Sequence, residues 1–521
     1  MRFRDLLLLV LAQGVVLSAV ALFQQGPGYM DAEYYAVLGR RMASGQGATE
    51  PFLWNYLDDP AGVPHPAFGY WAPLSAWLAA LGLRCWTSGG YPAARLPFLA
   101  LGMVLPPLTA LLTWRLTRRR PLAFFAGGTA IASGYYLPYW AVTETFSPTV
   151  VLGGLFWLLL LAWEERPRLW AAMGLGLLSA GLHLTRNEGI LWLLVAGVAI
   201  TVGVSGAQRR RHLAFLVGAY LLGYAPRWVA NLHTWGALSP PGSLRVLWLT
   251  AYDELFAYPA ARLNLVHWWS QGPTAWLAAW GWALRRNLLT AWAVQGQIVL
   301  LPFMVWGFWR ERHRLTVQAA LGGWLALLVG MTVLFPFPGA RGGFFHAGAA
   351  LQPMLWAWGA VGGEAGLRWA AHRRRWPWPQ SASVLGGGGL AILALLSMLV
   401  VAQRVVGPDP TRPVWQAAER RYVRLGQALA QRNGGTLPAV LVNNPPAWAW
   451  VHQDAPAFVI PDGGPDTAAA VARRFHAAWM WLEKDHPRGL DALYAHPRDG
   501  GAWRYVTTVE GVHLFALEEQ P

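Results

Sequence analysis

The sequence predicts a mainly α-helical polytopic membrane protein of about eleven transmembrane helices, followed by a C-terminal extracytoplasmic α/β domain. Of its 521 residues, 55% are hydrophobic and 13% are charged, whereas a typical soluble domain is about 25% charged. Apolar segments long enough to cross a bilayer recur through residues 1–406. The composition then changes at the linker GPDPTRP (407–413), after which helix and strand patterns alternate through residues 407–521.

The predicted spans begin with the apolar segment after Arg4, which we interpret as an uncleaved signal anchor because it is about 19 residues long. The others lie near residues 92–114, 122–139, 148–163, 169–185, 189–205, 212–229, 290–309, 315–334, 345–363 and 384–403. Two long outer loops follow from this assignment, residues 24–70 and residues 230–288. The apolar stretch 71–83 is expected to lie in the interface or to re-enter the membrane, and amphipathic pieces of 230–288 predict interfacial helices.

Arginine sets the predicted orientation. The net charge is +15, and Lys484 is the single lysine. With the N-terminus inside, the arginine clusters of five inter-span loops all fall on the cytoplasmic side, as the positive-inside rule requires. We therefore expect a multi-pass protein of the cytoplasmic (inner) membrane with its C-terminal domain outside. Basic residues scattered between spans are not typical of nucleic-acid binding, and the lone Cys85 excludes an intramolecular disulfide.

The first outer loop carries two carboxylates, Asp31 and Glu33, in the passage MDAEYYAVLGRRMASGQG. Ionisable groups at a membrane boundary are costly to place and often functional. The alternative is that Asp31 is the N-cap of a surface helix running from about residue 32 to 43. On a helix, side chains at positions i and i+2 point about 200° apart. Only one of the two carboxylates is therefore expected to face a common site.

Further polar residues near span ends share the predicted outer side. Glu144 precedes a span, Arg186 and Glu188 form the tight hairpin HLTRNEG, and Arg341 and His346 lie in FPFPGARGGFFHAG. Glycines in the last segment let backbone N–H groups approach an anion closely. Acids, arginines and a glycine-rich turn on one side suit a reaction between a lipid phosphate and a polar acceptor.

Each of these residues also has a purely structural interpretation. The hairpin arginine and glutamate can simply close the turn with a salt bridge, and Glu144 can be a solvated surface acid. Arg341 can be an interfacial anchor, and His65 and His346 can be packing residues. The sequence leaves both interpretations open.

Three of these passages resemble motifs of GT-C-fold glycosyltransferases, the broad group that includes the protein mannosyltransferases and the aminoarabinose transferases. They are the first-loop passage with its HPAFGYWAPL continuation, the hairpin TRNEGILWLL, and the turn GARGGFFHAGAALQPML. The similarity covers roughly residues 1–365 in layout. One departure is clear: the acidic pair of the family is adjacent, whereas Ala32 separates Asp31 from Glu33 here.

The resemblance implies an inverting transfer of a hexosyl or pentosyl group from a polyprenyl-phosphate-linked donor to a lipid, glycan or protein acceptor outside the membrane. Asp31 is the expected general base, and Arg341 and Arg186 would stabilise the phosphate leaving group. Glu144 would orient the acceptor or help to hold a divalent cation, and the sequence does not decide whether a metal is needed. The predicted catalytic residues are Asp31, Glu33 and Glu144, and the predicted substrate-binding residues are Tyr34, His65, Tyr70, Arg186, Glu188, Arg341 and His346.

Other functions stay open at this point. A transporter or a flippase for lipid-linked sugars would be expected to show charged or broken spans near the membrane midplane, often in paired repeats. A non-catalytic membrane protein would use its outer domain to bind a partner. Within the enzyme class, an oligosaccharide polymerase or ligase fits the same chemistry.

Overall fold

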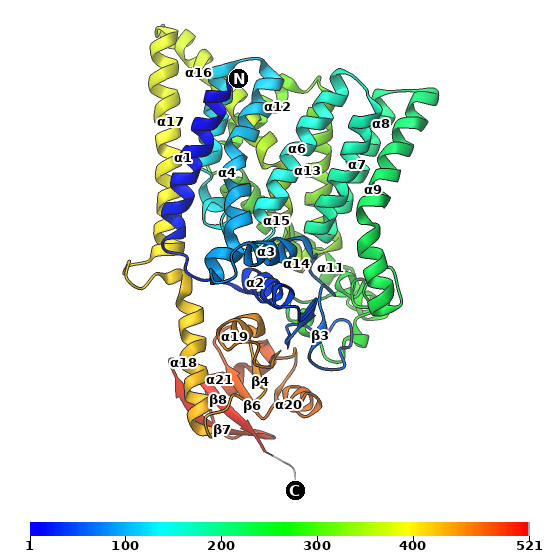
Figure 1. Ribbon diagram of the computed structural model, residues 1–521, viewed down its shortest axis with the longest axis vertical. Helices are drawn as coiled ribbons and strands as arrows, with labels where there is room; N and C mark the ends of the chain where they lie inside the picture. Colours follow the sequence, from blue (N-terminus) through cyan, green and yellow to red (C-terminus); the bar gives the residue numbers. More distant parts are fainter. Residues whose placement is uncertain (519–521) are drawn as a thin grey trace.

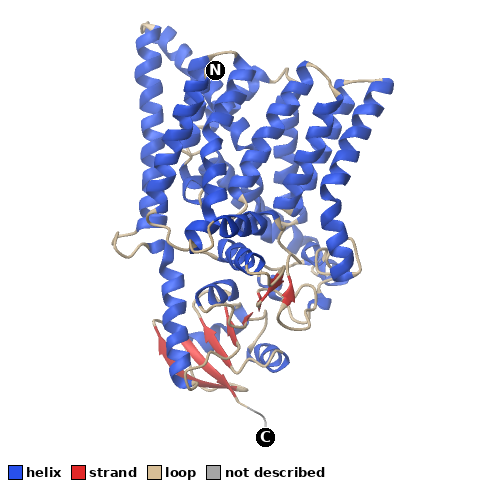
Figure 2. Ribbon diagram, viewed as in Figure 1, coloured by secondary structure: helices blue, strands red, loops and turns tan. Residues whose placement is uncertain are grey.

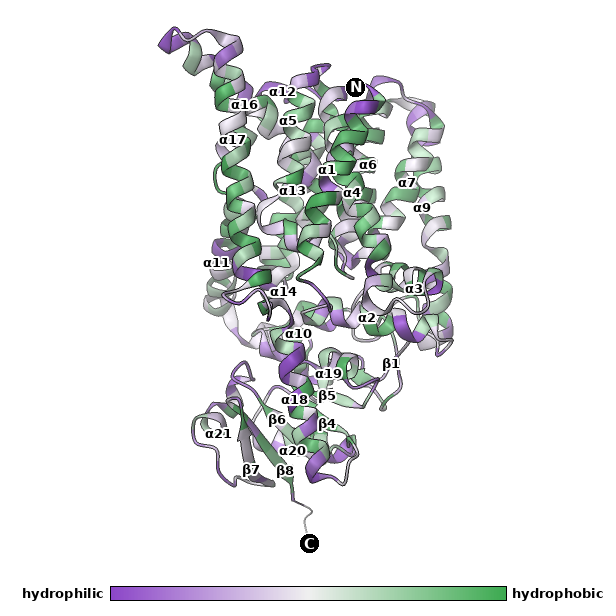
Figure 3. Ribbon diagram, turned by 60° about the vertical axis from the view of Figure 1, so that its left-hand side comes forward, coloured by the Kyte–Doolittle hydropathy of each residue, from purple (hydrophilic) through white to green (hydrophobic). Residues whose placement is uncertain are grey.

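The computed structural model describes residues 1–518. It has a bundle of long helices, a layer of short helices across one end of the bundle, and a C-terminal α/β domain beyond that layer (Figure 1, Figure 2). The bundle is largely hydrophobic, whereas the helix ends farthest from the C-terminal domain are hydrophilic (Figure 3). The chain is therefore an integral membrane protein, as its composition predicts.

Six of the described helical segments are long and apolar enough to cross a bilayer. They are α1 (Phe3–Ala21), α4 (Gly90–Thr117), α6 (Phe146–Glu165), α9 (Gly206–Trp235), α13 with its π-helical extension (Leu315–Leu334), and α17 with its extension (Trp378–Val406). Other bundle helices are shorter or follow a break, namely α5 (Arg120–Ile131), α7 (Leu169–Thr185), α8 (Ile190–Gly203), α12 (Leu301–Glu311) and α16 (Gln352–Arg374). Helix α11 (Gly272–Thr290) lies at the level of the short helices across the bundle end (Figure 1).

Two of the predicted spans are interrupted. The segment 122–139 leaves the α-helix at Ile131 and continues as a short 3₁₀ turn, Gly134–Tyr139, because Gly134 has a φ of 61° and Pro138 lacks an N–H donor. The segment 290–309 is divided by a π-helical turn, Ala291–Gln295, before α12 begins. Hydropathy does not detect either break, because both segments are apolar.

The first outer loop forms most of the layer across the bundle end. Its helices α2 (Met30–Ala43) and α3 (Leu74–Cys85) lie across the direction of the bundle helices (Figure 1). The apolar stretch predicted at 71–83 is α3. Helix α2 begins at Met30 with Tyr29 at its N-cap position, so the N-cap interpretation of Asp31 is wrong: Asp31 lies inside the first helical turn. An acid there still interacts favourably with the helix dipole.

The C-terminal domain is built on a six-stranded sheet with the strand order β2-β5-β4-β6-β8-β7. Strands β5, β4 and β6 are parallel, and β8 and β7 add as an antiparallel hairpin. The strands are β4 (Val440–Val442), β5 (Ala457–Val459), β6 (Trp479–Leu482), β7 (Trp503–Val509) and β8 (Val512–Leu517), and the helices are α18 (Ala417–Arg432), α19 (Pro445–Val451), α20 (Pro465–Arg474) and α21 (Asp491–Ala495). The predicted α/β pattern is confirmed.

One strand of that sheet comes from the first outer loop. β2 (Phe52–Leu53) pairs in parallel with β5 at the edge of the sheet. A two-residue strand has no hydrophobic periodicity to reveal it in a sequence. The outer loop is thus part of the C-terminal domain as well as part of the layer over the bundle.

Side-chain contacts fasten the C-terminal domain to α2. The carboxylate of Asp454 accepts hydrogen bonds from both Arg40 and Arg41, each at 2.7 Å. The indole of Trp415 donates to the carbonyl of Gly26 at 3.0 Å, just before α2. The domain therefore holds in place the helix that carries Asp31.

A substitution at Gly28 tests the junction between α2 and the C-terminal domain. It has a φ of +85°, and a Cβ there would lie 2.3 Å from Nε1 of Trp415. Gly45 has a similar φ of +82° with no atom near its Cβ position, so it is a matched control for backbone strain alone. We expect Gly45→Ala to cost roughly 1–2 kcal/mol and Gly28→Ala to cost clearly more. Thermal unfolding followed by tryptophan fluorescence measures both, and equal losses would contradict the packing described here.

Candidate active site

A cavity of about 830 Å³ lies between the bundle, the first outer loop and the C-terminal domain. Its size falls within the range of sites that hold a small ligand. Asp31 of α2, Arg186 after α7, and Arg341 and His346 before α16 line it from the membrane module. The C-terminal domain contributes Arg421, Tyr422, Asn443, Asn444 and Glu483, among others.

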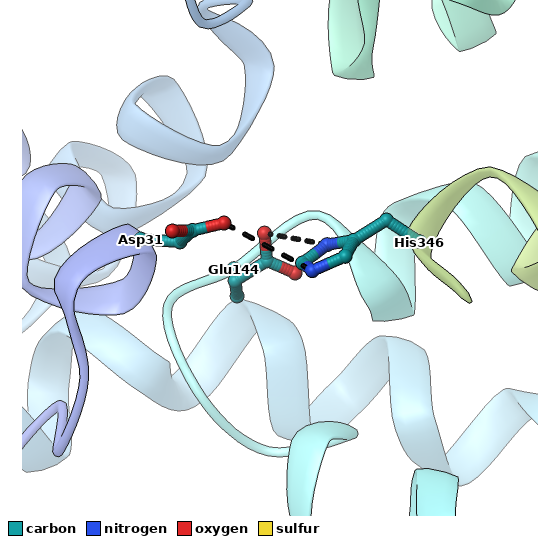
Figure 4. Close-up of side chains that lie close together, drawn as sticks. All are labelled: Asp31, Glu144 and His346. Atoms are coloured by element: carbon teal, nitrogen blue, oxygen red, sulfur yellow. Dashed lines mark ion pairs between the residues drawn. The ribbon is translucent and has the colours of Figure 1, made fainter. Parts of the chain in front are cut away.

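Three of the predicted residues meet at one place beside this cavity, which Asp31 and His346 line (Figure 4). Nε2 of His346 lies 3.9 Å from Oδ2 of Asp31, and Nδ1 of His346 lies 3.3 Å from Oε1 of Glu144. The imidazole ring stacks on Phe146 with a centroid distance of 4.3 Å. The three polar side chains come from α2, from the turn before α6, and from α15 (Phe344–Gly348). Segments more than 100 residues apart in sequence thus build one cluster.

Glu144 is held by its own turn. Its side chain is 1% exposed, and its carboxylate accepts hydrogen bonds from the Thr145 hydroxyl at 3.0 Å and from the Phe146 amide at 3.2 Å. The hydroxyl of Thr143 donates to the carbonyl of Ala32 at 2.8 Å, which ties this turn to α2. Glu144 is therefore buried behind His346 and is not a solvated surface acid.

The two carboxylates have different ionisation behaviour. Burial raises the pKa of Asp31 to about 6, although His346 beside it favours the charged form. Burial also acts to raise the pKa of Glu144, but His346 and Arg186 outweigh it and hold that pKa below its ordinary value. A carboxyl group whose pKa lies near the working pH suits proton transfer, and one with a lowered pKa stays a fixed negative charge.

In the hairpin after α7, Arg186 and Glu188 close the turn and also line the cavity. The two side chains form an ion pair. The amide of Asn187 donates to the carbonyl of Tyr70 at 2.7 Å, and Tyr70 lines the cavity as well. The turn is closed by its salt bridge and at the same time positions a guanidinium group toward the site.

Arg341 reaches the cavity from a distorted helical turn. Its guanidinium carbon lies 4.2 Å from the ring centroid of Tyr252, a residue of the second outer loop. The following residue, Gly342, has a φ of 140°, which a side chain would disfavour. The glycine-rich sequence therefore serves to turn the backbone beside the site.

The structure places two of the predicted site residues of α2, Tyr34 and Glu33, away from the cavity. Tyr34 is fully buried, and its hydroxyl donates to Glu50 at 2.7 Å, so it does not reach the cavity. Glu33 is also fully buried and accepts a hydrogen bond from Asn444 at 2.7 Å. It joins α2 to the C-terminal domain instead of facing Asp31, because the two side chains leave the helix in nearly opposite directions.

His65, a third predicted site residue, does not line the main cavity either. Its Nε2 lies 3.1 Å from Asp58 and its Nδ1 lies 3.9 Å from Glu50, in a small pocket apart from the main cavity. Between two acids, the pKa of His65 rises to about 10, because their charges and hydrogen bonds outweigh the effect of burial. Asp58 and Glu50 are the two acids. The cluster stabilises the outer loop.

Sequence reasoning missed Tyr35. Its side chain is 1% exposed and lines the cavity, and its hydroxyl has no hydrogen-bond partner among residues 1–518. Tyr35 follows Asp31 by four positions, a spacing that places two side chains on the same helix face. That spacing was the available signal. The cavity residues of the C-terminal domain gave no comparable signal, because only the tertiary structure brings them to the site.

The cluster of Asp31, Glu144 and His346 could also hold a metal ion. One donor atom from each lies within 4.8 Å of the others. Nδ1 of His346 is buried without a hydrogen-bond partner in the described chain. Two carboxylates and an imidazole are ligands that divalent cations accept. The donor set therefore fits a divalent cation.

Comparison with solved structures identifies the fold. The oligosaccharyltransferase of Archaeoglobus fulgidus, in complex with Zn and sulfate, matches with a TM-score of 0.58 at 11% identity over 98% of this chain and 73% of its own. ArnT of Cupriavidus metallidurans bound to undecaprenyl phosphate matches with a TM-score of 0.57 at 13% identity over 98% and 97%. The apo state of ArnT matches with a TM-score of 0.55 at 14% identity. The chain has the GT-C fold.

This result confirms the resemblance drawn from the three sequence motifs, as far as the fold is concerned. At such low identity the likeness reaches the arrangement of helices and says nothing about individual side chains. No protein-family model matches the sequence, and no curated protein sequence does.

Metal binding by the cluster can be measured directly. We expect Mn²⁺ or Zn²⁺ to bind the purified full chain in isothermal titration, and His346→Ala to weaken binding by at least about tenfold, because one of three donors is lost. His267→Ala is the matched control, since His267 also contacts an acid, Glu254 at 2.8 Å, away from the cluster. Equal effects of the two variants would rule out this site.

Proposed function

We propose that the protein is a glycosyltransferase that moves a sugar from a polyprenyl-phosphate-linked donor to an acceptor hydroxyl at the outer face of the cytoplasmic membrane. The observation that carries the proposal is the carboxylate of Asp31, which faces a large cavity beside Glu144 and His346. The GT-C fold supports it, because the matching solved proteins are an oligosaccharyltransferase and ArnT.

The donor class follows from the charges and from the position of the cavity. Arg186 and Arg341 line the cavity next to the bundle, where the phosphate of a membrane-anchored donor would arrive. Guanidinium groups bind phosphate oxygens through paired hydrogen bonds. The ArnT structure holds undecaprenyl phosphate, which is consistent with a donor of this kind. The second outer loop contributes Tyr252 under Arg341 and so helps to fix that arginine.

In the proposed reaction, Asp31 accepts the proton of the acceptor hydroxyl as that oxygen attacks the anomeric carbon. The bond between this carbon and the phosphate oxygen breaks, and its electron pair leaves with the lipid phosphate. Attack opposite the leaving group inverts the anomeric configuration. Arg186 and Arg341 stabilise the charge that develops on the phosphate. Glu144 stays ionised and holds the imidazole ring of His346 at 3.3 Å. The other nitrogen of that ring lies 3.9 Å from the carboxylate of Asp31.

A divalent cation held by Asp31, Glu144 and His346 would supply additional positive charge near the phosphate. With a cation present, Asp31 would be shared between metal binding and proton transfer. The chelation of such a cation would then lower the transfer rate, and the titration described above shows whether the cation binds.

Asp31→Asn tests the general base. We expect it to lower sugar transfer by about 10²- to 10⁴-fold, because an amide cannot accept the proton. Glu33→Gln is the matched control, since Glu33 lies two residues away on the same helix but faces Asn444. The measurement is the transfer of radiolabelled sugar from a panel of polyprenyl-phosphate sugars in membranes containing each variant at equal levels. Equal activity of Asp31→Asn and wild type would remove Asp31 as the base.

The pH dependence gives an independent test. Asp31 can act as a base only when it is deprotonated, and its pKa is about 6. Transfer should therefore rise about tenfold per pH unit on the acidic side and level off above pH 6. Initial rates of the solubilised enzyme at saturating donor measure this limb. A rate that is flat from about pH 4.5 to 7.5 would contradict the assignment.

The main alternative is a flippase for lipid-linked sugars. Such a protein would move the donor across the bilayer without breaking the sugar–phosphate bond. Donor translocation in vesicles without transfer to any acceptor would favour that alternative, whereas a released lipid phosphate accompanies only the transfer reaction.

A further inference from the structure

The cavity contains a second cationic position that the proposed chemistry does not use. Four arginines line the cavity. Arg186 pairs with Glu188, and Arg421 pairs with Glu483 at 2.6 Å. Arg341 is exposed and lies over the ring of Tyr252. The fourth, Arg227 of α9, has a different environment from all three.

Arg227 is a buried guanidinium without a counter-ion. The residue is 8% exposed, and across residues 1–518 it forms no ion pair with a carboxylate. Its guanidinium carbon lies 5.7 Å from the ring centroid of Phe68 and 5.8 Å from that of Trp235. Its hydrogen-bond partner is the carbonyl of Phe68. A charge withdrawn from water is costly unless an opposite charge compensates it.

The surroundings of Arg227 are built to hold it there. Phe68 has a φ of +70°, a conformation that is unfavourable for a bulky residue. Its amide donates to Tyr34 at 3.1 Å, and its carbonyl meets Arg227. Strain of this kind persists where the surrounding contacts determine the geometry. Here it turns the carbonyl toward the guanidinium, which remains on the cavity wall.

Neighbouring groups on the same wall can complete a binding site. Asn231 follows Arg227 by one helical turn and is 2% exposed, and its amide nitrogen donates to the carbonyl of Leu238 at 2.7 Å. Its Oδ1 has no hydrogen-bond partner in the described part of the chain and can accept a hydrogen bond from a hydroxyl of the bound molecule. His183 stacks on Tyr224 at 4.1 Å, and its Nδ1 lies 2.7 Å from the hydroxyl of Tyr220. A Tyr220 hydroxyl that donates to Nδ1 leaves Nε2 of His183 as a second N–H donor. His183, Tyr224 and Asn231 all line the cavity.

We propose that Arg227 binds an anionic group, a phosphate or a carboxylate, carried by the acceptor substrate. This assignment rests on the proposed transfer reaction, in which one phosphate leaves and interacts with Arg186 and Arg341. A second cation on a different helix, with no acid to neutralise it, has no role in that step. The missing counter-ion is supplied when the acceptor binds, and the acceptor of this protein is therefore an anionic molecule.

Binding of inorganic phosphate tests the site without any transfer assay. The full chain is placed in phosphatidylcholine nanodiscs and saturated with undecaprenyl phosphate, which occupies the donor position. Radiolabelled inorganic phosphate is then titrated by equilibrium dialysis. We expect about one further equivalent to bind wild type, and Arg227→Gln to weaken that binding at least tenfold. Arg286→Gln, which alters an exposed arginine of α11 outside the cavity, should bind as wild type does.

A second variant guards against misfolding of Arg227→Gln. Asn231→Asp keeps the arginine and places a carboxylate one turn away, at a spacing that favours an ion pair. We expect this internal counter-ion to abolish phosphate binding while the chain stays folded, as judged by thermal unfolding without phosphate. Phosphate binding to both variants at wild-type strength, or no phosphate binding to wild type, would overturn the proposal.

Undecaprenyl phosphate provides the third measurement. Its affinity should fall in Arg341→Gln and stay within about twofold of wild type in Arg227→Gln. The opposite pattern would show that Arg227 holds the donor phosphate and would overturn the assignment to the acceptor.

Repeating the phosphate titration in nanodiscs with phosphatidylglycerol separates two sources of the anion. Competition by this lipid indicates a lipid headgroup, and the absence of competition indicates a free or glycan-borne group. These assays measure binding and not sugar transfer. A negative result would overturn the assignment of Arg227 without contradicting the proposed transfer reaction.

Discussion

The position of α2 is the constraint on which the rest of the site depends. This helix lies across the end of the bundle and is buried from both sides, by the transmembrane helices and by the C-terminal domain (Figure 1). Because α2 is buried on both sides, its different faces make different contacts. Asp31 and Tyr35 face the cavity, while Glu33 and Arg40 bind the C-terminal domain. Displacement of either neighbour would move the proposed base.

The C-terminal domain is consequently part of the site and not an appendage. Strand β2 of the first outer loop completes the edge of its sheet, and Asn444 binds Glu33 directly. The domain also forms the far wall of the cavity with Tyr422 and Asn443. The cavity is therefore closed by residues of the C-terminal domain, which follows Asp31 by several hundred residues in sequence.

The cavity uses arginine in distinct ways, and the environment of each one decides its role. An arginine paired with an acid, such as Arg186, is held in place with a compensated charge. An exposed arginine stacked on an aromatic ring, such as Arg341, keeps its donors free. A buried and unpaired arginine, such as Arg227, is the one that requires an external anion.

Much of the architecture was predictable from composition and motif. Low charge, recurring apolar segments and the change at residue 407 indicate a membrane bundle with a C-terminal α/β domain, because hydropathy reports burial in lipid directly. The spacing of Asp31, Glu144, Arg341 and His346 relative to the spans placed them on one side. Only the tertiary structure decided which of these side chains meet, namely His346 with the two acids Asp31 and Glu144. It also decided that Tyr34 and Glu33 point away from the cavity, and that Arg227 has no acid beside it. These depend on rotation about helix axes and on pairing between distant segments, and neither is encoded in local periodicity.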